Sequence, residues 1–147
     1  MGLDFMLSSI IGGILATYVL LAMGAWSHRL GLPRLDFPKP MAALTFGESF
    51  QGQEPPYWAG MAVVYMNGIV FALIYSTAVA QYLPGDPVIK GAIWGIILYV
   101  VSCVFYVPLY LREGFFLSGV HRHAWITSAM VHGLYGIVVG WLCPIAP

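Results

Sequence analysis

Four long apolar stretches, nearly free of acidic and basic side chains, constrain this sequence more than any other feature. They cover residues 6–26, 57–79, 88–111 and 124–142, and Lys90, near the start of the third, is the only Asp, Glu, Lys or Arg among them. A helix needs about 20 apolar residues to cross the hydrocarbon core of a bilayer. The sequence therefore predicts an all-α, polytopic membrane protein, a bundle of four transmembrane helices in a lipid bilayer.

Composition and the connections define the limits of this domain. Only 8% of the 147 residues are charged, against about 25% in soluble domains, which excludes a water-soluble core. The connection at residues 27–56 is the only long one, so we expect a single four-helix domain over residues 1–147 with a long first cytoplasmic loop. The formal net charge is zero and no glycine-rich phosphate loop is present, so neither nucleic acid nor nucleotide is expected as a partner.

The basic residues are distributed unevenly over the connections. Five of the six lie in the first and third connections, and Lys90 alone flanks the second. Because Lys and Arg accumulate in cytoplasmic loops, we predict that the first and third connections face the cytoplasm. Both the N-terminus and the C-terminus would then lie on the non-cytoplasmic side of the membrane.

Small residues recur at four-residue spacing in three of the stretches: Ser9, Gly13 and Thr17; Gly91 and Gly95; Gly136 and Gly140. Such spacing lets helix backbones approach closely in a membrane. We expect tight helix packing at these stripes, either inside the bundle or against another subunit, and the sequence leaves both open. Pro108 is expected to bend the third helix near its cytoplasmic end.

A polar layer is expected inside the bundle at the depth of His132, the one residue of the four stretches that titrates near neutral pH. Counting about 1.5 Å per residue from the cytoplasmic edge puts Asn67 at a similar depth, with Tyr18 and Tyr106 nearby. One interpretation is structural: a neutral His132 hydrogen-bonds Asn67 or a hydroxyl group and fixes helix register. The other is functional: these four residues hold haem, a quinone or a substrate headgroup. Haem with two histidine ligands is not expected, because no second histidine lies in the stretches.

Three further histidines, His28, His121 and His123, fall at the predicted cytoplasmic interface. Acidic residues in the adjoining loops could complete a metal site there: Asp36, Glu48, Glu54 and Glu113. In an extended segment His121 and His123 project to the same side and could chelate one ion, whereas in a helix they diverge. The alternative is that the histidines lie among lipid headgroups as amphipathic interface residues.

Two of the stretches share an apolar pattern that contains glycine, NGIVFALIY at residues 67–75 and HGLYGIVVG at residues 132–140. With this pattern the chain resembles small four-helix bacterial integral membrane proteins of unknown function. The resemblance covers the apolar stretches and not the long loop. It implies a place in the bacterial inner membrane and supplies no activity.

The sequence contains no hydrolase or protease motif and requires no cofactor, and its stretches hold no carboxylate to couple transport to ions. An enzyme is therefore not expected. The leading expectation is a non-catalytic, accessory or stabilising subunit of a larger membrane complex, energy-converting (respiratory or photosynthetic) or transporting, that contacts other subunits through its glycine stripes and long loop. The alternatives are a haem-, quinone- or metal-binding redox protein and a passive channel or uncoupled carrier.

Overall fold

The computed structural model describes residues 2–47 and 52–146. Within these ranges, four helical segments are long and apolar enough to cross a membrane: Leu3–Leu30, Tyr57–Tyr82, Pro87–Leu111 and Ala124–Leu142. Each lies on a stretch for which the sequence predicted a transmembrane helix. The prediction of an all-α, polytopic membrane protein is therefore confirmed.

Several of the α-helices are extended by short helical segments of other types. In chain order the main elements are α1 (Leu3–Trp26), η1 (Ser27–Leu30), α2 (Pro38–Phe46), α3 (Tyr57–Ile74), η2 (Tyr75–Val79), η3 (Ala80–Tyr82), α4 (Pro87–Val101), η4 (Ser102–Leu111), η5 (Phe115–Leu117) and α5 (Ala124–Leu142). The segments η2 and η4 are π-helical, whereas η1, η3 and η5 are 3-10 helices.

Local sequence explains where α4 begins and why it changes form. Asp86 Oδ1 accepts hydrogen bonds from the N–H groups of Val88 and Ile89 at 2.9 and 3.1 Å, and Pro87 stands at the first helical position, where its missing N–H costs nothing. Pro108 lies inside η4. Because a proline ring collides with the carbonyl group four residues earlier in an α-helix, the wider π-helical turn accommodates it.

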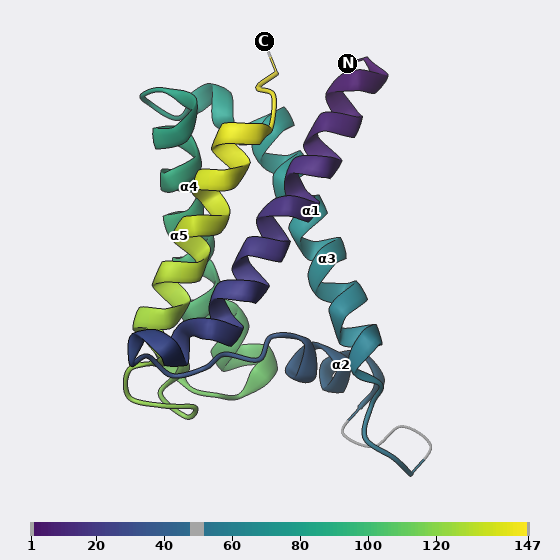
Figure 1. Ribbon diagram of the computed structural model, residues 1–147, viewed down its shortest axis with the longest axis vertical. Helices are drawn as coiled ribbons and strands as arrows, with labels where there is room; N and C mark the ends of the chain where they lie inside the picture. Colours follow the sequence, from purple (N-terminus) through teal and green to yellow (C-terminus); the bar gives the residue numbers. More distant parts are fainter. Residues whose placement is uncertain (1, 48–51, 147) are drawn as a thin grey trace.

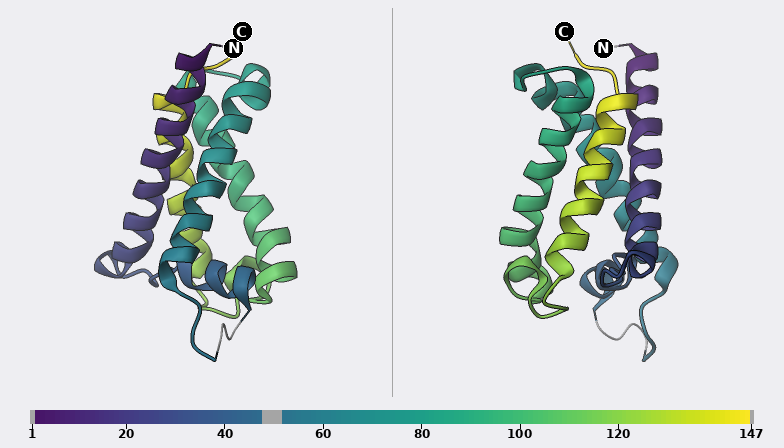
Figure 2. Two further views of the ribbon diagram at one scale, coloured as in Figure 1. Left: turned by 90° about the vertical axis from the view of Figure 1, so that its right-hand side faces the viewer. Right: turned by 60° about the vertical axis from the view of Figure 1, so that its left-hand side comes forward.

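The four membrane helices form an open arrangement (Figure 1). α5 packs between α4 and α1, and α1 packs between α5 and α3. α3 and α4 are joined by the turn at residues 83–86, but they diverge towards the opposite end of the molecule (Figure 2, left). Both termini lie at the same end as this turn (Figure 1). We call the opposite end, which carries the long loop, the loop end.

α2 closes the loop end between α3 and η4 (Figure 2, left). It rests on Gly60 of α3, where a Cβ atom would collide with the carbonyl oxygen of Pro38. On its other side the hydroxyl group of Tyr106 donates a hydrogen bond to Met41 Sδ at 3.1 Å. This part of the long loop, expected as a contact for another subunit, thus packs against its own chain.

Glycines form the contact between α4 and α5. A Cβ atom added to any member of this set would collide with the backbone of the other helix: Gly91, Gly95, Gly136 and Gly140. We call these four residues the glycine seam. The small residues of α1 are buried as well, and Gly13 lies directly against the backbone of Gly68 and Ile69 in α3. The structure therefore places all three small-residue stripes inside the bundle.

Candidate functional site

Residues 33–37 lie between η1 and α2 at the loop end of the bundle. Ser27 Oγ and Thr127 Oγ1 donate hydrogen bonds to the carbonyl oxygen of Pro33 at 2.8 and 3.0 Å. Leu35 is buried in an apolar cluster with side chains of η4, η5 and α5. The segment thereby fixes the surroundings of the candidate site residues that lie nearest to the loop.

His132 is held by its own helix and lies beside two aromatic rings. Its Nδ1 atom is 2.8 Å from the carbonyl oxygen of Ser128. A carbonyl oxygen can only accept a hydrogen bond, so Nδ1 carries the proton of the neutral ring and Nε2 keeps a free lone pair. The ring centroids of Phe37 and Tyr99 lie 6.5 and 6.2 Å from that of the imidazole. His132 thus has one ring nitrogen fixed by its own helix, whereas Nε2 has no hydrogen-bond partner among the described residues.

Asn67 and His132 do not form a hydrogen bond with each other. Its side chain is exposed, and it makes no hydrogen bond with any residue that the structure describes. The polar bridge from α5 to α3 is made instead by Tyr135, whose hydroxyl group donates to the carbonyl oxygen of Gly68. The hydrogen bond between His132 and Asn67, anticipated from their similar depth, is therefore not formed within the described part of the chain.

The two tyrosines of the predicted polar layer point to different surroundings. Tyr106 bonds to Met41 in α2, and its ring lies 5.3 Å from that of Tyr110. Tyr18 is 62% exposed and lies on the side of α1 that faces α3. No hydrogen bond or ring contact joins any two of His132, Asn67, Tyr106 and Tyr18, and a site shared by the four stays a prediction.

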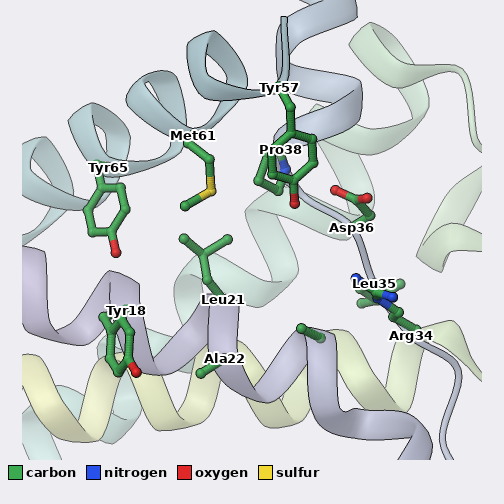
Figure 3. A pocket seen from close by; sticks show the side chains of 11 residues that line it. Tyr18, Leu21, Ala22, Arg34, Leu35, Asp36, Pro38, Tyr57, Met61 and Tyr65 are labelled. Atoms are coloured by element: carbon green, nitrogen blue, oxygen red, sulfur yellow. The ribbon is translucent and has the colours of Figure 1, made fainter.

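A hollow of about 280 Å³ lies between α1, α3 and the segment that leads into α2. Arg34, Asp36 and Tyr57 lie at one end, Leu21 and Met61 face each other further along, and Tyr18 and Tyr65 lie beyond them (Figure 3). We call this hollow the α1–α3 groove. The groove was not predicted from the sequence, although Arg34 and Asp36, two residues apart in the long loop, were an available signal.

The three histidines at the loop end do not converge. The rings of His121 and His123 are 5.6 Å apart, and the His123 N–H donates to His121 Nδ1 at 3.1 Å. His28 Nδ1 instead lies 3.0 Å from the carbonyl oxygen of Ala25. Among residues 2–47 and 52–146, no three His, Cys, Asp or Glu side chains are grouped so as to hold a metal ion. Glu48, proposed as a further ligand, lies outside the described residues.

The thiol of Cys143, at the end that carries both termini, has a raised pKa. Cys143 follows the last residue of α5, and its side chain is buried against Gly12 of α1. Burial raises the pKa of the Cys143 thiol from its ordinary value of 9.0 to about 11. The thiol is therefore protonated at neutral pH and serves as a small apolar group.

The helices and their contacts define a small polytopic membrane protein of the four-helix type. The chain belongs to the DUF6789 family, a family of unknown function, whose sequence profile matches residues 3–146. The match includes the long loop as well as the membrane helices. No curated protein and no solved structure shows a match to the chain.

Proposed function

We propose that this protein is a non-catalytic subunit of a larger membrane complex and that it receives a transmembrane helix of another subunit between α3 and α4. The observation that carries the proposal is Asn67, an exposed amide on a membrane helix without a hydrogen-bond partner among the described residues. An unpaired polar group in hydrocarbon costs several kcal/mol. A polar side chain or backbone group on a neighbouring helix would offset part of that cost.

The position of Asn67 on α3 supports a particular place for such a helix. Asn67 follows Gly60 by seven residues and so lies on the same face of the helix. That face carries α2, which lies between α3 and η4. Asn67 therefore faces the space where α3 and α4 diverge, about 10 Å further into the membrane than Gly60.

Exposed apolar side chains border the same space. On α3, Phe71 and Ile74 share the face of Asn67. On α4, Ile97 and Val101 lie on the side of Trp94, whose ring is 6.4 Å from that of Tyr75 in η2. These two helix faces, which we call the α3–α4 opening, offer a partner helix an apolar surface with one polar anchor. The glycine stripes, expected to serve as contacts for other subunits, are used inside the bundle instead.

Site-specific crosslinking tests this proposal. A photoreactive amino acid at Phe71, inside the opening, should crosslink the full chain to one membrane protein in native membranes. The same amino acid at Met66, which is exposed on another face of α3, should not. Equal crosslinking from both positions, or crosslinks to lipid alone, would contradict the proposal.

Substitution of the anchor supplies a second test. An interhelical hydrogen bond in a membrane is worth about 1–2 kcal/mol, so Asn67→Leu should reduce recovery of the crosslinked partner in mild detergent by roughly 5- to 30-fold. Met66→Leu is the matched control and should leave recovery unchanged. Because Asn67 makes no bond within the described chain, both variants should unfold like the parent protein, which separates a lost contact from a lost fold.

The membrane orientation is part of the same proposal. Five of the six basic residues belong to the connections at the loop end, whereas Lys90 lies near the end that carries both termini. The positive-inside rule then puts the loop end in the cytoplasm of a bacterial cell, with the termini outside its inner membrane. Reporter domains fused to either terminus should be active only if they work outside the cytoplasm.

A second candidate function is the binding of haem or a quinone at His132. It is favoured by the fixed Nδ1 atom, because metal-binding histidines usually donate their other ring N–H to a carbonyl or carboxylate group. The neighbouring rings of Phe37 and Tyr99 would suit a flat aromatic ligand. The purified protein should then show a Soret band, or yield a quinone on extraction, that His132→Leu removes. Preparations without either would exclude this function.

A further inference from the structure

We propose that the α1–α3 groove binds one phospholipid with a phosphoethanolamine headgroup, taken from the leaflet at the loop end. Its phosphate would lie on Arg34 and its ammonium group on Asp36, with an acyl chain along α1 and α3. This lipid site is independent of the helix-binding opening, which lies on another face of α3.

Both charged side chains line the polar end of the groove, and Leu35 between them lines it as well. Leu35 is also buried in the apolar cluster at the loop end, which anchors the chain between its two charged neighbours. A guanidinium group and a carboxylate on one rim suit a headgroup that carries both a phosphate and an ammonium group.

Both charges are available to a ligand. Arg34 makes no ion pair with any described residue, since the one salt bridge found in that part of the chain joins Lys39 to Glu54. Asp36 Oδ1 accepts a hydrogen bond from the Lys39 N–H at 3.2 Å, and the carboxylate has the Tyr57 hydroxyl as a further polar neighbour. The Tyr57 hydroxyl points towards the Asp36 carboxylate (Figure 3) and can share a bound ammonium group with it.

The apolar part of the groove exists because α1 has small residues there. Ala22 and Ala25, one helical turn apart, leave room opposite Met61 of α3. The volume of about 280 Å³ is just below the range of about 300–1,000 Å³ typical of ligand pockets. A groove of this size would hold only the headgroup and the first part of an acyl chain, while the remaining chain would lie in the bilayer.

The chemistry of the rim selects among common phospholipids. A primary ammonium group donates N–H hydrogen bonds to a carboxylate, and charge-assisted bonds of this kind are the strong ones. A choline headgroup has no N–H, so it cannot make them. A glycerol headgroup has no cation to neutralise Asp36, and its lipid carries a net negative charge close to that carboxylate.

Native mass spectrometry of the full chain, offered phosphatidylethanolamine, phosphatidylcholine or phosphatidylglycerol with identical acyl chains, tests the site. We expect one tightly held phosphatidylethanolamine, with about tenfold weaker retention of the other two lipids, equivalent to about 1.4 kcal/mol. Equal retention of all three, or a preference for phosphatidylglycerol, would overturn the proposal.

Amino-acid substitutions test whether the phospholipid binds in the groove. Arg34→Gln and Asp36→Asn should each remove the preference for phosphatidylethanolamine, and asparagine can still accept the bond from the Lys39 N–H. Arg29→Gln is the control, because Arg29 lies over the ring of Trp26 and outside the groove. Ala22→Phe should fill the groove and abolish retention without changing a charge. A preference that survives Arg34→Gln, Asp36→Asn and Ala22→Phe would refute the assignment.

Discussion

The α4–α5 contact and the α3–α4 opening are formed by helices of similar apolar character, but only the first is closed. α4 and α5 meet along the glycine seam, whereas α3 and α4 diverge from their connecting turn (Figure 2, left). An apolar side chain gains little free energy when it moves from lipid tails into a contact between helices. Close approach of the helix backbones therefore decides which helices associate. Ile97 and Val101, which are exposed on α4, are larger than the glycines of the seam and provide no such approach.

The largest predicted effect on stability comes from adding a side-chain atom within the glycine seam. Gly136→Ala places a Cβ atom against the carbonyl oxygen of Gly91 and should destabilise the protein by about 3 kcal/mol. Gly133→Ala in the same helix is the control. No neighbouring atom lies within 4 Å of its added Cβ atom, so the better helix propensity of alanine should leave stability unchanged or raise it by up to about 1 kcal/mol.

Unfolding of both variants by SDS in mixed micelles, followed by circular dichroism, measures this difference. A similar free energy of unfolding for Gly136→Ala and Gly133→Ala would mean that the seam is not closely packed. The contrast between the closed contact and the opening would then disappear.

A smaller effect is expected where α2 closes the opening at the loop end. Gly60→Ala would push Pro38, and α2 with it, away from α3 at a cost of about 2 kcal/mol. Limited proteolysis in detergent should then cut the loop faster than in the parent protein. Ala62→Leu, at an exposed position of the same helix, should be cut at the parental rate. Unchanged protection in Gly60→Ala would show that α2 does not depend on this contact.

Removal of one hydrogen bond should have a more modest effect on the same loop. Thr127→Val loses the bond to the Pro33 carbonyl oxygen, whose typical contribution is about 1 kcal/mol. Thr77→Val is matched in chemistry but removes only a bond to the carbonyl oxygen of Leu73 in the preceding turn. We expect the free energy of unfolding to fall for Thr127→Val and to change less for Thr77→Val. The reverse order would contradict the role assigned to residues 33–37.

The smallest effect at neutral pH concerns the thiol of Cys143, which packs against α1 near the N-terminus. With a pKa of about 11 when folded and 9.0 ordinarily, Cys143 binds more protons in the folded state between these values. Its contribution to stability is therefore complete below about pH 9 and is lost as pH rises towards 11. In a Cys103→Ala background, maleimide should label Cys143 much more slowly at pH 7.5 than it labels an exposed cysteine introduced by Ser118→Cys. Comparable rates would show that the C-terminal contact opens readily.

Structural features with a strong physical cause were predicted well from the sequence. The four apolar stretches yielded the membrane helices, because spanning a bilayer requires length and apolarity that few other structures share. The polar layer was inferred from depth alone, and depth does not specify direction around a helix. His132 and Asn67 accordingly lie on helices that place their side chains in different surroundings. The haem, quinone, metal and channel hypotheses stay predictions.

The sequence by itself determined that this chain crosses a membrane as helices, and its basic residues support one orientation. Only the tertiary structure decided that the glycine stripes pack internally, that α2 lies across the loop end and that Arg34 and Asp36 border a groove beside Tyr57. The reason is the range of the forces involved. Membrane insertion depends on the sum of local side-chain properties, whereas the partner of a helix face depends on how distant segments fit together.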